Sequence, residues 1–308
     1  MKDYNAIFKH ILHPFLRITA CIVIGLMAAR WIFTINSSII NINEEAWLFT
    51  LTPILSLILV SVFLWKRLNI LTFDRSGNKI IIIIACVATV TIVSWKMQFA
   101  LKYLSGKVHV VETIEEIDLN SPWIFYRINN FNVTTDSIAF IADYRYSGKH
   151  NHLLNLKYNA ALPFVTNLYD HSGNSAKIWC GITFIEQTGS DGYRGPDNLN
   201  EKFNNFIKEC HQYITIRDFS KYTYFEKVID RLDIKKYNSA IRTRIGYQSD
   251  ASYLILEPVK KSLYQRGVEN LIWGMFLLFV GIVIIFAVLV NGKYDEEEHI
   301  RQLSGKGE

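Results

Sequence analysis

The sequence predicts a membrane protein with four transmembrane α-helices and an α+β extracytoplasmic domain inserted between helices 3 and 4. Three observations lead to this fold class. Four stretches are apolar over the roughly 20 residues of helix that a bilayer requires. A long block between the third and fourth stretches has ordinary globular composition. The basic residues of the short connecting segments alternate as in multi-pass proteins.

The four spans are expected at residues 18–35, 46–65, 79–99 and 270–290. A cleavable signal peptide has an apolar run of about 7–15 residues, shorter than the first stretch, and a second span follows closely. We therefore expect the first helix to be retained. Gly274 and Gly281 lie seven residues apart in the fourth span. This spacing suits close helix packing, either within the chain or between copies in a homo-oligomer.

The distribution of Lys and Arg predicts the orientation of the helices. Basic residues lie in both tails and in the loop between the second and third spans, whereas the first loop has Glu44 and Glu45 and no basic residue. Positively charged segments stay inside, so both termini are expected in the cytoplasm and the large block outside. An Ile-, Asn- and Lys-rich composition indicates a bacterial host, and hence a bacterial inner (plasma) membrane with a periplasmic domain. The net charge of +5 then reflects topology, and no basic run or zinc pattern indicates nucleic-acid binding.

These boundaries divide the chain into three parts: the N-tail and three spans (1–103), the extracytoplasmic domain (104–266), and the fourth span with the C-tail (267–308). Within the domain, alternating apolar residues predict strands first and a helical period later. Spacing of this kind favours an antiparallel sheet with helices. The expected strands are 108–114, 123–128, 138–146, 153–164, 177–187, 222–228 and 253–256, and the expected helices are 198–213 and 234–245.

The four cysteines follow the same division. Cys21 and Cys86 fall inside spans, where cysteine behaves as a small apolar residue. Cys180 and Cys210 fall in the outer domain, in a compartment that permits disulfides. We expect them to be bridged, and the alternative is a pair of buried free thiols.

One loop of the domain carries residues typical of binding. The segment 189–196 is rich in glycine and contains Tyr193 and Arg194, residue types that dominate interface hot spots, although a catalytic lid has a similar composition. The aromatic strand 123–126 offers further anchors, against the more ordinary interpretation as core. His150, His152, Asp170 and His171 are of residue types that bind metals, but they lie beside turn residues typical of exposed loops. We expect no metal, no cofactor and no catalytic residue, since the chain has no nucleophile elbow and no phosphate loop.

Three classes of function remain. The expected one is a membrane-anchored module whose outer domain binds a protein or envelope partner, such as an immunity protein against an envelope-acting toxin or an accessory subunit of an envelope machine. A channel or transporter component is the second, although the spans lack inverted repeats and charged interior pairs. The third is an envelope enzyme with an unrecognised site.

Overall fold

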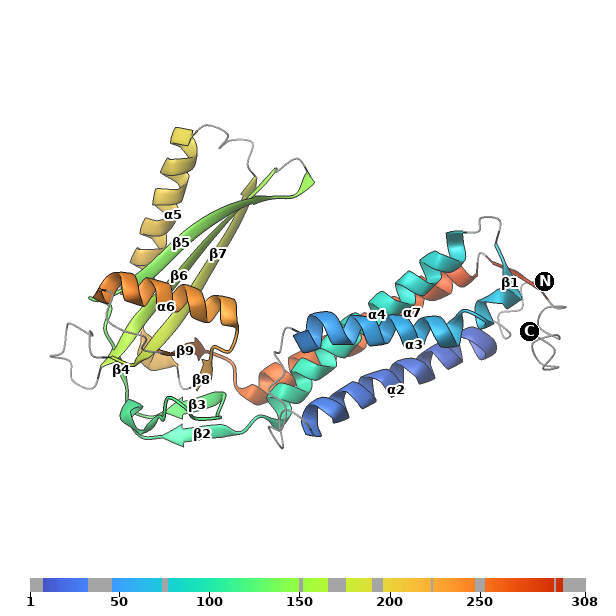
Figure 1. Cartoon of the computed structure of the whole chain (residues 1–308), viewed down its shortest axis with the longest axis horizontal. Helices are drawn as coiled ribbons and strands as arrows, with labels where there is room; N and C mark the ends of the chain where they lie inside the picture. The colour runs from blue at the N-terminus through green and yellow to red at the C-terminus, as the bar shows by residue number, and fades with distance from the viewer. Residues whose placement is uncertain are drawn as a thin grey trace. The chain divides into compact units, whose positions relative to one another are not determined.

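The computed structural model describes residues 8–32, 46–73, 77–149, 152–165, 176–189, 196–222, 224–246, 253–290 and 292–295. The chain divides into two units (Figure 1). Unit 1 joins Met1–Gly106 to Leu263–Glu308, and unit 2 is the intervening Lys107–Ser262.

Among its described residues, unit 1 has four helices that are long and apolar enough to cross a membrane: Phe8–Arg30, Ala46–Leu64, Lys79–Ser105 and Leu263–Leu289. The first joins a π-helical turn (Phe8–Leu12) to α2 (His13–Arg30), so it begins earlier than the predicted residue 18, and the predicted end at residue 35 lies outside the described residues. The second joins a π-helical turn (Ala46–Leu51) to α3 (Thr52–Leu64), as predicted. Both α4 (Gly77–Ser105) and α7 (Leu263–Leu289) extend beyond the predicted apolar runs, because a helix continues through polar residues that hydrophobicity does not mark.

At one end of this bundle, two short strands pair antiparallel. They are β1 (Leu71–Thr72), which follows a 3-10 turn (Arg67–Ile70) after α3, and β10 (Lys293–Tyr294), which follows α7. The loop between α3 and α4 and the segment after α7 therefore lie at the same end of unit 1.

Glycines on α7 bring it close to α4. Gly267, Gly274 and Gly281 recur every seven residues, the spacing of an interhelical seam. A Cβ built on them would lie 2.5, 3.0 and 2.3 Å from the nearest side-chain atoms of α4. The contacting residues on α4 are Leu104 for Gly267, Met97 for Gly274 and Thr89 for Gly281. Gly274 and Gly281 therefore pack against another helix of the same chain.

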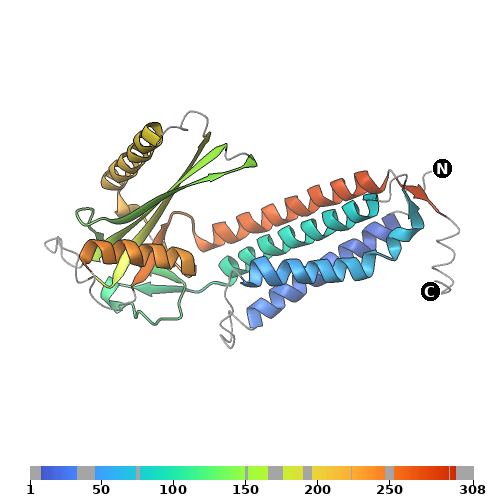
Figure 2. The ribbon, with the colours of Figure 1, turned by 45° about the horizontal axis from the view of Figure 1, so that its top comes forward.

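The described part of unit 2 is an eight-stranded sheet with a helix on each face (Figure 2). The strand order is β2-β3-β8-β9-β7-β6-β4, and β5 also pairs with β6. Short 3-10 turns occur at Ile114–Glu116 and Phe219–Lys221. The strands are β2 (Val108–Val111), β3 (Phe125–Ile128), β4 (Asn132–Val133), β5 (Ala139–Ser147), β6 (Leu153–Val165), β7 (Ile178–Gly189), β8 (Tyr224–Lys227) and β9 (Leu254–Val259).

The sheet is mixed, so the prediction of an antiparallel sheet is correct only in part. β2 pairs parallel with β3 and β7 pairs parallel with β9, whereas the other pairs are antiparallel. Parallel strands need long connections. Two helices and β8 lie between β7 and β9, and the alternation that marks a strand does not reveal which distant strand lies beside it.

The two helices cover opposite faces of the sheet because successive side chains of a strand point to opposite sides. On β7, Cys180 and Ile182 join the core under α5 (Pro196–Ile216), and Trp179 joins the core under α6 (Arg231–Ile245). Long aromatic and aliphatic side chains fill both layers.

The predicted disulfide between Cys180 and Cys210 is wrong: both are free, buried cysteines. Burial raises the pKa of Cys210 to about 11, with smaller contributions from Glu209 and Glu186. Burial also raises the pKa of Cys180, and the charge of Arg217, which follows α5, opposes this. Cys180 lies on β7 and Cys210 on α5, and the two are not within disulfide-bonding distance. A disulfide requires Cα atoms about 4.4–6.8 Å apart.

Candidate functional site

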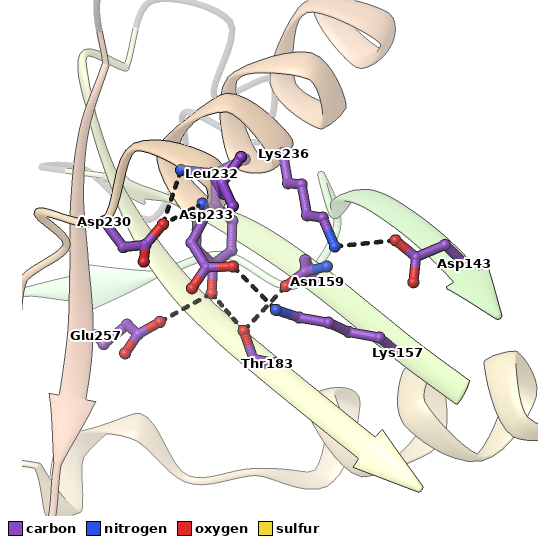
Figure 3. A network of polar contacts seen from close by, with 10 residues as sticks. Asp143, Lys157, Asn159, Thr183, Asp230, Leu232, Asp233, Lys236 and Glu257 are labelled. Atoms are coloured by element: carbon purple, nitrogen blue, oxygen red, sulfur yellow. Dashed lines mark hydrogen bonds and ion pairs between the residues drawn. The ribbon is translucent and has the colours of Figure 1, made fainter. Parts of the chain in front are cut away.

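A network of polar side chains lies between α6 and the sheet of unit 2 (Figure 3). In an antiparallel pair, residues directly opposite one another share a face. Asp143 on β5 pairs with Lys157 on β6, and Asn159 on β6 pairs with Thr183 on β7, so these polar groups lie together under the helix. Glu257 on β9 completes the set from the sheet.

Local sequence holds α6 above these side chains. The carboxylate of Asp230 caps the helix by accepting hydrogen bonds from the backbone N–H of Leu232 and Asp233. Asp233, Lys236 and Tyr237 follow at helical spacing on the face toward the sheet. Gly181 on β7 makes room for the tyrosine ring, because a Cβ there would lie 3.0 Å from Tyr237 Cζ.

A chain of contacts runs inward from Glu257. The Tyr237 hydroxyl lies 3.0 Å from Glu257 Oε1 and 2.9 Å from Thr183 Oγ1. Thr183 Oγ1 in turn donates to Asn159 Oδ1 over 3.1 Å. The Tyr237 hydroxyl donates to Glu257 Oε1, so the carboxyl is the acceptor at the end of this chain.

The surroundings of Glu257 shift its pKa upward. Burial raises the pKa of the carboxyl above its usual value, and the opposite Glu226 of β8 and nearby Asp233 raise it further. Tyr237 and Lys157 act in the other direction with smaller effect than burial. The pKa of Tyr237 is also raised, first by burial and then by Glu257, so both partners favour their neutral forms.

Two ion pairs flank this chain. Lys157 Nζ lies 2.9 Å from Asp233 Oδ1, and Lys236 Nζ lies 2.9 Å from Asp143 Oδ2. All four side chains are partly exposed, so each pair contributes about 0–1 kcal/mol and orients α6 more than it stabilises it. Within the described parts of the chain, no three His, Cys, Asp or Glu side chains could together hold a metal ion. The network therefore fixes α6 on the sheet and places a carboxyl of raised pKa against the Tyr237 hydroxyl.

A second surface lies where β5, β6 and β7 end. Leu153 at the start of β6 pairs with Ser147 of β5 and with Gly189 of β7, so the β5–β6 turn and the end of β7 share one tip. The predicted binding residues Tyr193 and Arg194 lie outside the described residues. Strand β7 ends at this tip with Gly189, and α5 begins at Pro196. The segment that contains Tyr193 and Arg194 therefore starts from the tip.

Side chains that the sequence analysis did not select gather at this strand tip. Tyr144 and Tyr146 of β5 are 43% and 39% exposed, and the Tyr144 ring packs edge-on against Phe203 of α5. On the opposite face, Asn155 accepts a hydrogen bond from Gln187 over 2.8 Å. In the sequence, these tyrosines are marked by a Tyr-Arg-Tyr alternation (144–146) directly before the Ser147-Gly148 turn.

Other predicted candidates have local roles or lie outside the described residues. His150, Asp170 and His171 are among the latter. His152 Nδ1 lies 2.6 Å from the carbonyl oxygen of Lys149 and so belongs to the β5–β6 turn. In the aromatic strand, Tyr126 is fully buried, as the core interpretation requires.

Comparisons with known proteins found no matching family model, no matching curated protein and no matching solved structure.

Proposed function

We propose that this chain is a multi-pass protein of a bacterial inner membrane whose unit 2 lies in the periplasm and binds a protein or another envelope component. The observation that carries the proposal is the insertion of unit 2 between α4 and α7, two helices apolar enough to cross a membrane. A domain tethered at both ends is held near the membrane surface, which raises its effective concentration toward a partner there.

The pairing of β1 with β10 supports the orientation. It brings the basic loop between α3 and α4 to the same end of unit 1 as the segment after α7. Positive segments favour the cytoplasmic side, so this end is inside, together with both termini. An immunity protein against an envelope-acting toxin and an accessory subunit of an envelope machine are the two kinds of role that this arrangement suits.

We assign binding to the strand tip, because it combines exposed tyrosines with the end of β7 that leads into the Tyr193–Arg194 loop. Tyr and Arg supply much of the binding energy at protein interfaces. In the described part of unit 2, β5 pairs with β6 alone, so its outer edge is available to a partner strand.

Two experiments test the proposal. Reporter fusions after Arg75 and at the C-terminus should report cytoplasm, and a fusion after Gly173 should report periplasm. A periplasmic C-terminus would overturn the orientation.

The binding site is tested with photo-crosslinking residues at Tyr144, Tyr146 and Tyr193, and at Val110, an exposed residue of β2, as the matched control. We expect one shared crosslinked partner at the three tip positions and not at Val110. Equal capture at Val110, or no shared partner at the tip, would contradict the assignment. Substituting Tyr193 and Arg194 with Ala should weaken capture in a folded protein.

A further inference from the structure

Polar side chains line the contact between α3 and α4 in the interior of unit 1, where hydrocarbon would surround the helices. Thr52 and Ser56 lie one turn apart on α3, and Ser94 and Gln98 lie one turn apart on α4. All four are fully buried. Polar groups are rare in such a place unless they have hydrogen-bond partners.

The first layer of this contact is a closed ring of hydrogen bonds. The indole N–H of Trp47 donates to Gln98 Oε1 over 2.6 Å, and Gln98 Nε2 donates to Thr52 Oγ1 over 3.3 Å. Thr52 Oγ1 donates to the Trp47 carbonyl oxygen over 3.0 Å. Every side chain of the ring has a partner, so this layer is a specific interhelical clamp.

The ring also fixes the register of the two helices. Since the beginning of α3 meets the last part of α4, the helices run antiparallel, and one turn along α3 corresponds to one turn back along α4. Ser56 and Ser94 therefore share the second layer. Val60 and Val90, both fully buried, occupy the third, where the polar contact ends.

The second layer is not satisfied by the protein. Among the described residues, neither Ser56 Oγ nor Ser94 Oγ has a hydrogen-bond partner, and the same holds for Thr91 Oγ1 on the next turn of α4. A serine in a helix can bond to the carbonyl four residues back, but these two do not. Buried groups of this kind in native proteins are usually satisfied by ordered water.

We propose that Ser56 and Ser94 bind internal water, so that the contact between α3 and α4 holds a hydrated polar site. The Trp47–Thr52–Gln98 ring closes it on one side and the Val60–Val90 layer on the other. The side chains of all three layers are uncharged, which suits a neutral hydrogen-bonding ligand and not an ion. This inference depends on the packing of α3 against α4 and not on the location or partner of unit 2.

A double-mutant cycle on the full chain in detergent tests the proposal. Ser56→Ala and Ser94→Ala should each lower Tm by roughly 2–8 °C, because each leaves the water and the remaining hydroxyl with one partner fewer. The double variant should lose less than the sum of the two single shifts, since both act on the same water. Ser61→Ala, at a partly exposed position of α3, is the matched control and should leave Tm unchanged.

Unchanged or raised Tm in the single variants would show dry hydroxyls and overturn the proposal, and so would strictly additive losses. A density map that resolves ordered water separates the remaining cases. A peak within hydrogen-bonding distance of both hydroxyls supports the proposal, whereas a direct contact between Ser56 and Ser94 excludes it.

Discussion

The close approach of α7 to α4 predicts that Gly281→Ala destabilises unit 1. The new Cβ would lie 2.3 Å from Thr89 Cγ2 and 2.5 Å from Thr89 Oγ1, far inside van der Waals contact. Thr89 cannot rotate away freely, because its hydroxyl donates to the Ala85 carbonyl oxygen over 2.8 Å. Either that hydrogen bond breaks or the helices separate.

The magnitude follows from two opposing terms. Overpacking of a tight contact costs about 1–3 kcal/mol. Replacing glycine by alanine within a helix returns about 1 kcal/mol. Gly25→Ala in α2 isolates the second term, because no atom beyond the neighbouring residues and the helix's own backbone lies within 4 Å of the new Cβ. The two variants should therefore differ by about 1–3 kcal/mol, with Gly281→Ala the less stable.

Thermal unfolding of the purified full chain in one detergent measures this difference, and each kcal/mol shifts Tm by about 2–4 °C. Adding Thr89→Ala to Gly281→Ala removes the two clashing atoms and should restore most of the loss. If Gly281→Ala is as stable as Gly25→Ala, or if Thr89→Ala restores nothing, the close packing of α7 on α4 is wrong.

Three further predictions concern unit 2. Because burial raises the pKa of Glu257 above its ordinary 4.5, the free energy of unfolding should fall as pH rises from about that value through the raised pKa, by up to about 1.4 kcal/mol per pH unit. Chemical denaturation across pH should show this slope in the natural chain and not in Glu257→Gln; an unchanged slope would mean that another group titrates. Tyr237→Phe should cost about 1–3 kcal/mol by breaking the buried contact chain, whereas Tyr144→Phe, at an exposed ring, should cost little. Finally, mass spectrometry after alkylation of the unreduced, denatured chain should find Cys180 and Cys210 labelled, and a linked peptide pair would contradict the structure.

The parts of the fold that sequence predicts well are those encoded locally. The strand expected at 138–146 is β5 at Ala139–Ser147, and the helix expected at 198–213 is α5 at Pro196–Ile216. Helix α6 begins three residues before the predicted Ile234, because the Asp230 cap sets its start ahead of the apolar period. In these elements the side-chain period alone carries the information.

The remaining features depend on contacts between distant residues. The parallel pairing of β7 with β9 and the separation of Cys180 from Cys210 both follow from the path of the chain through α5, β8 and α6. Glu257 resembles an ordinary strand-end carboxylate in the sequence, and only the arrival of Tyr237 above it makes it part of a buried network. No local pattern marks such a pair.

The glycine seam between α4 and α7 also has a consequence for biosynthesis. The two helices form a hairpin that is interrupted by all of unit 2, so α4 emerges from the ribosome long before its partner. At about 5–20 residues per second, synthesis of the intervening segment takes roughly 10–30 s. During that interval the face of α4 that receives Gly267, Gly274 and Gly281 has no α7 to cover it. Folding of unit 1 is therefore completed last, when α7 packs against α4.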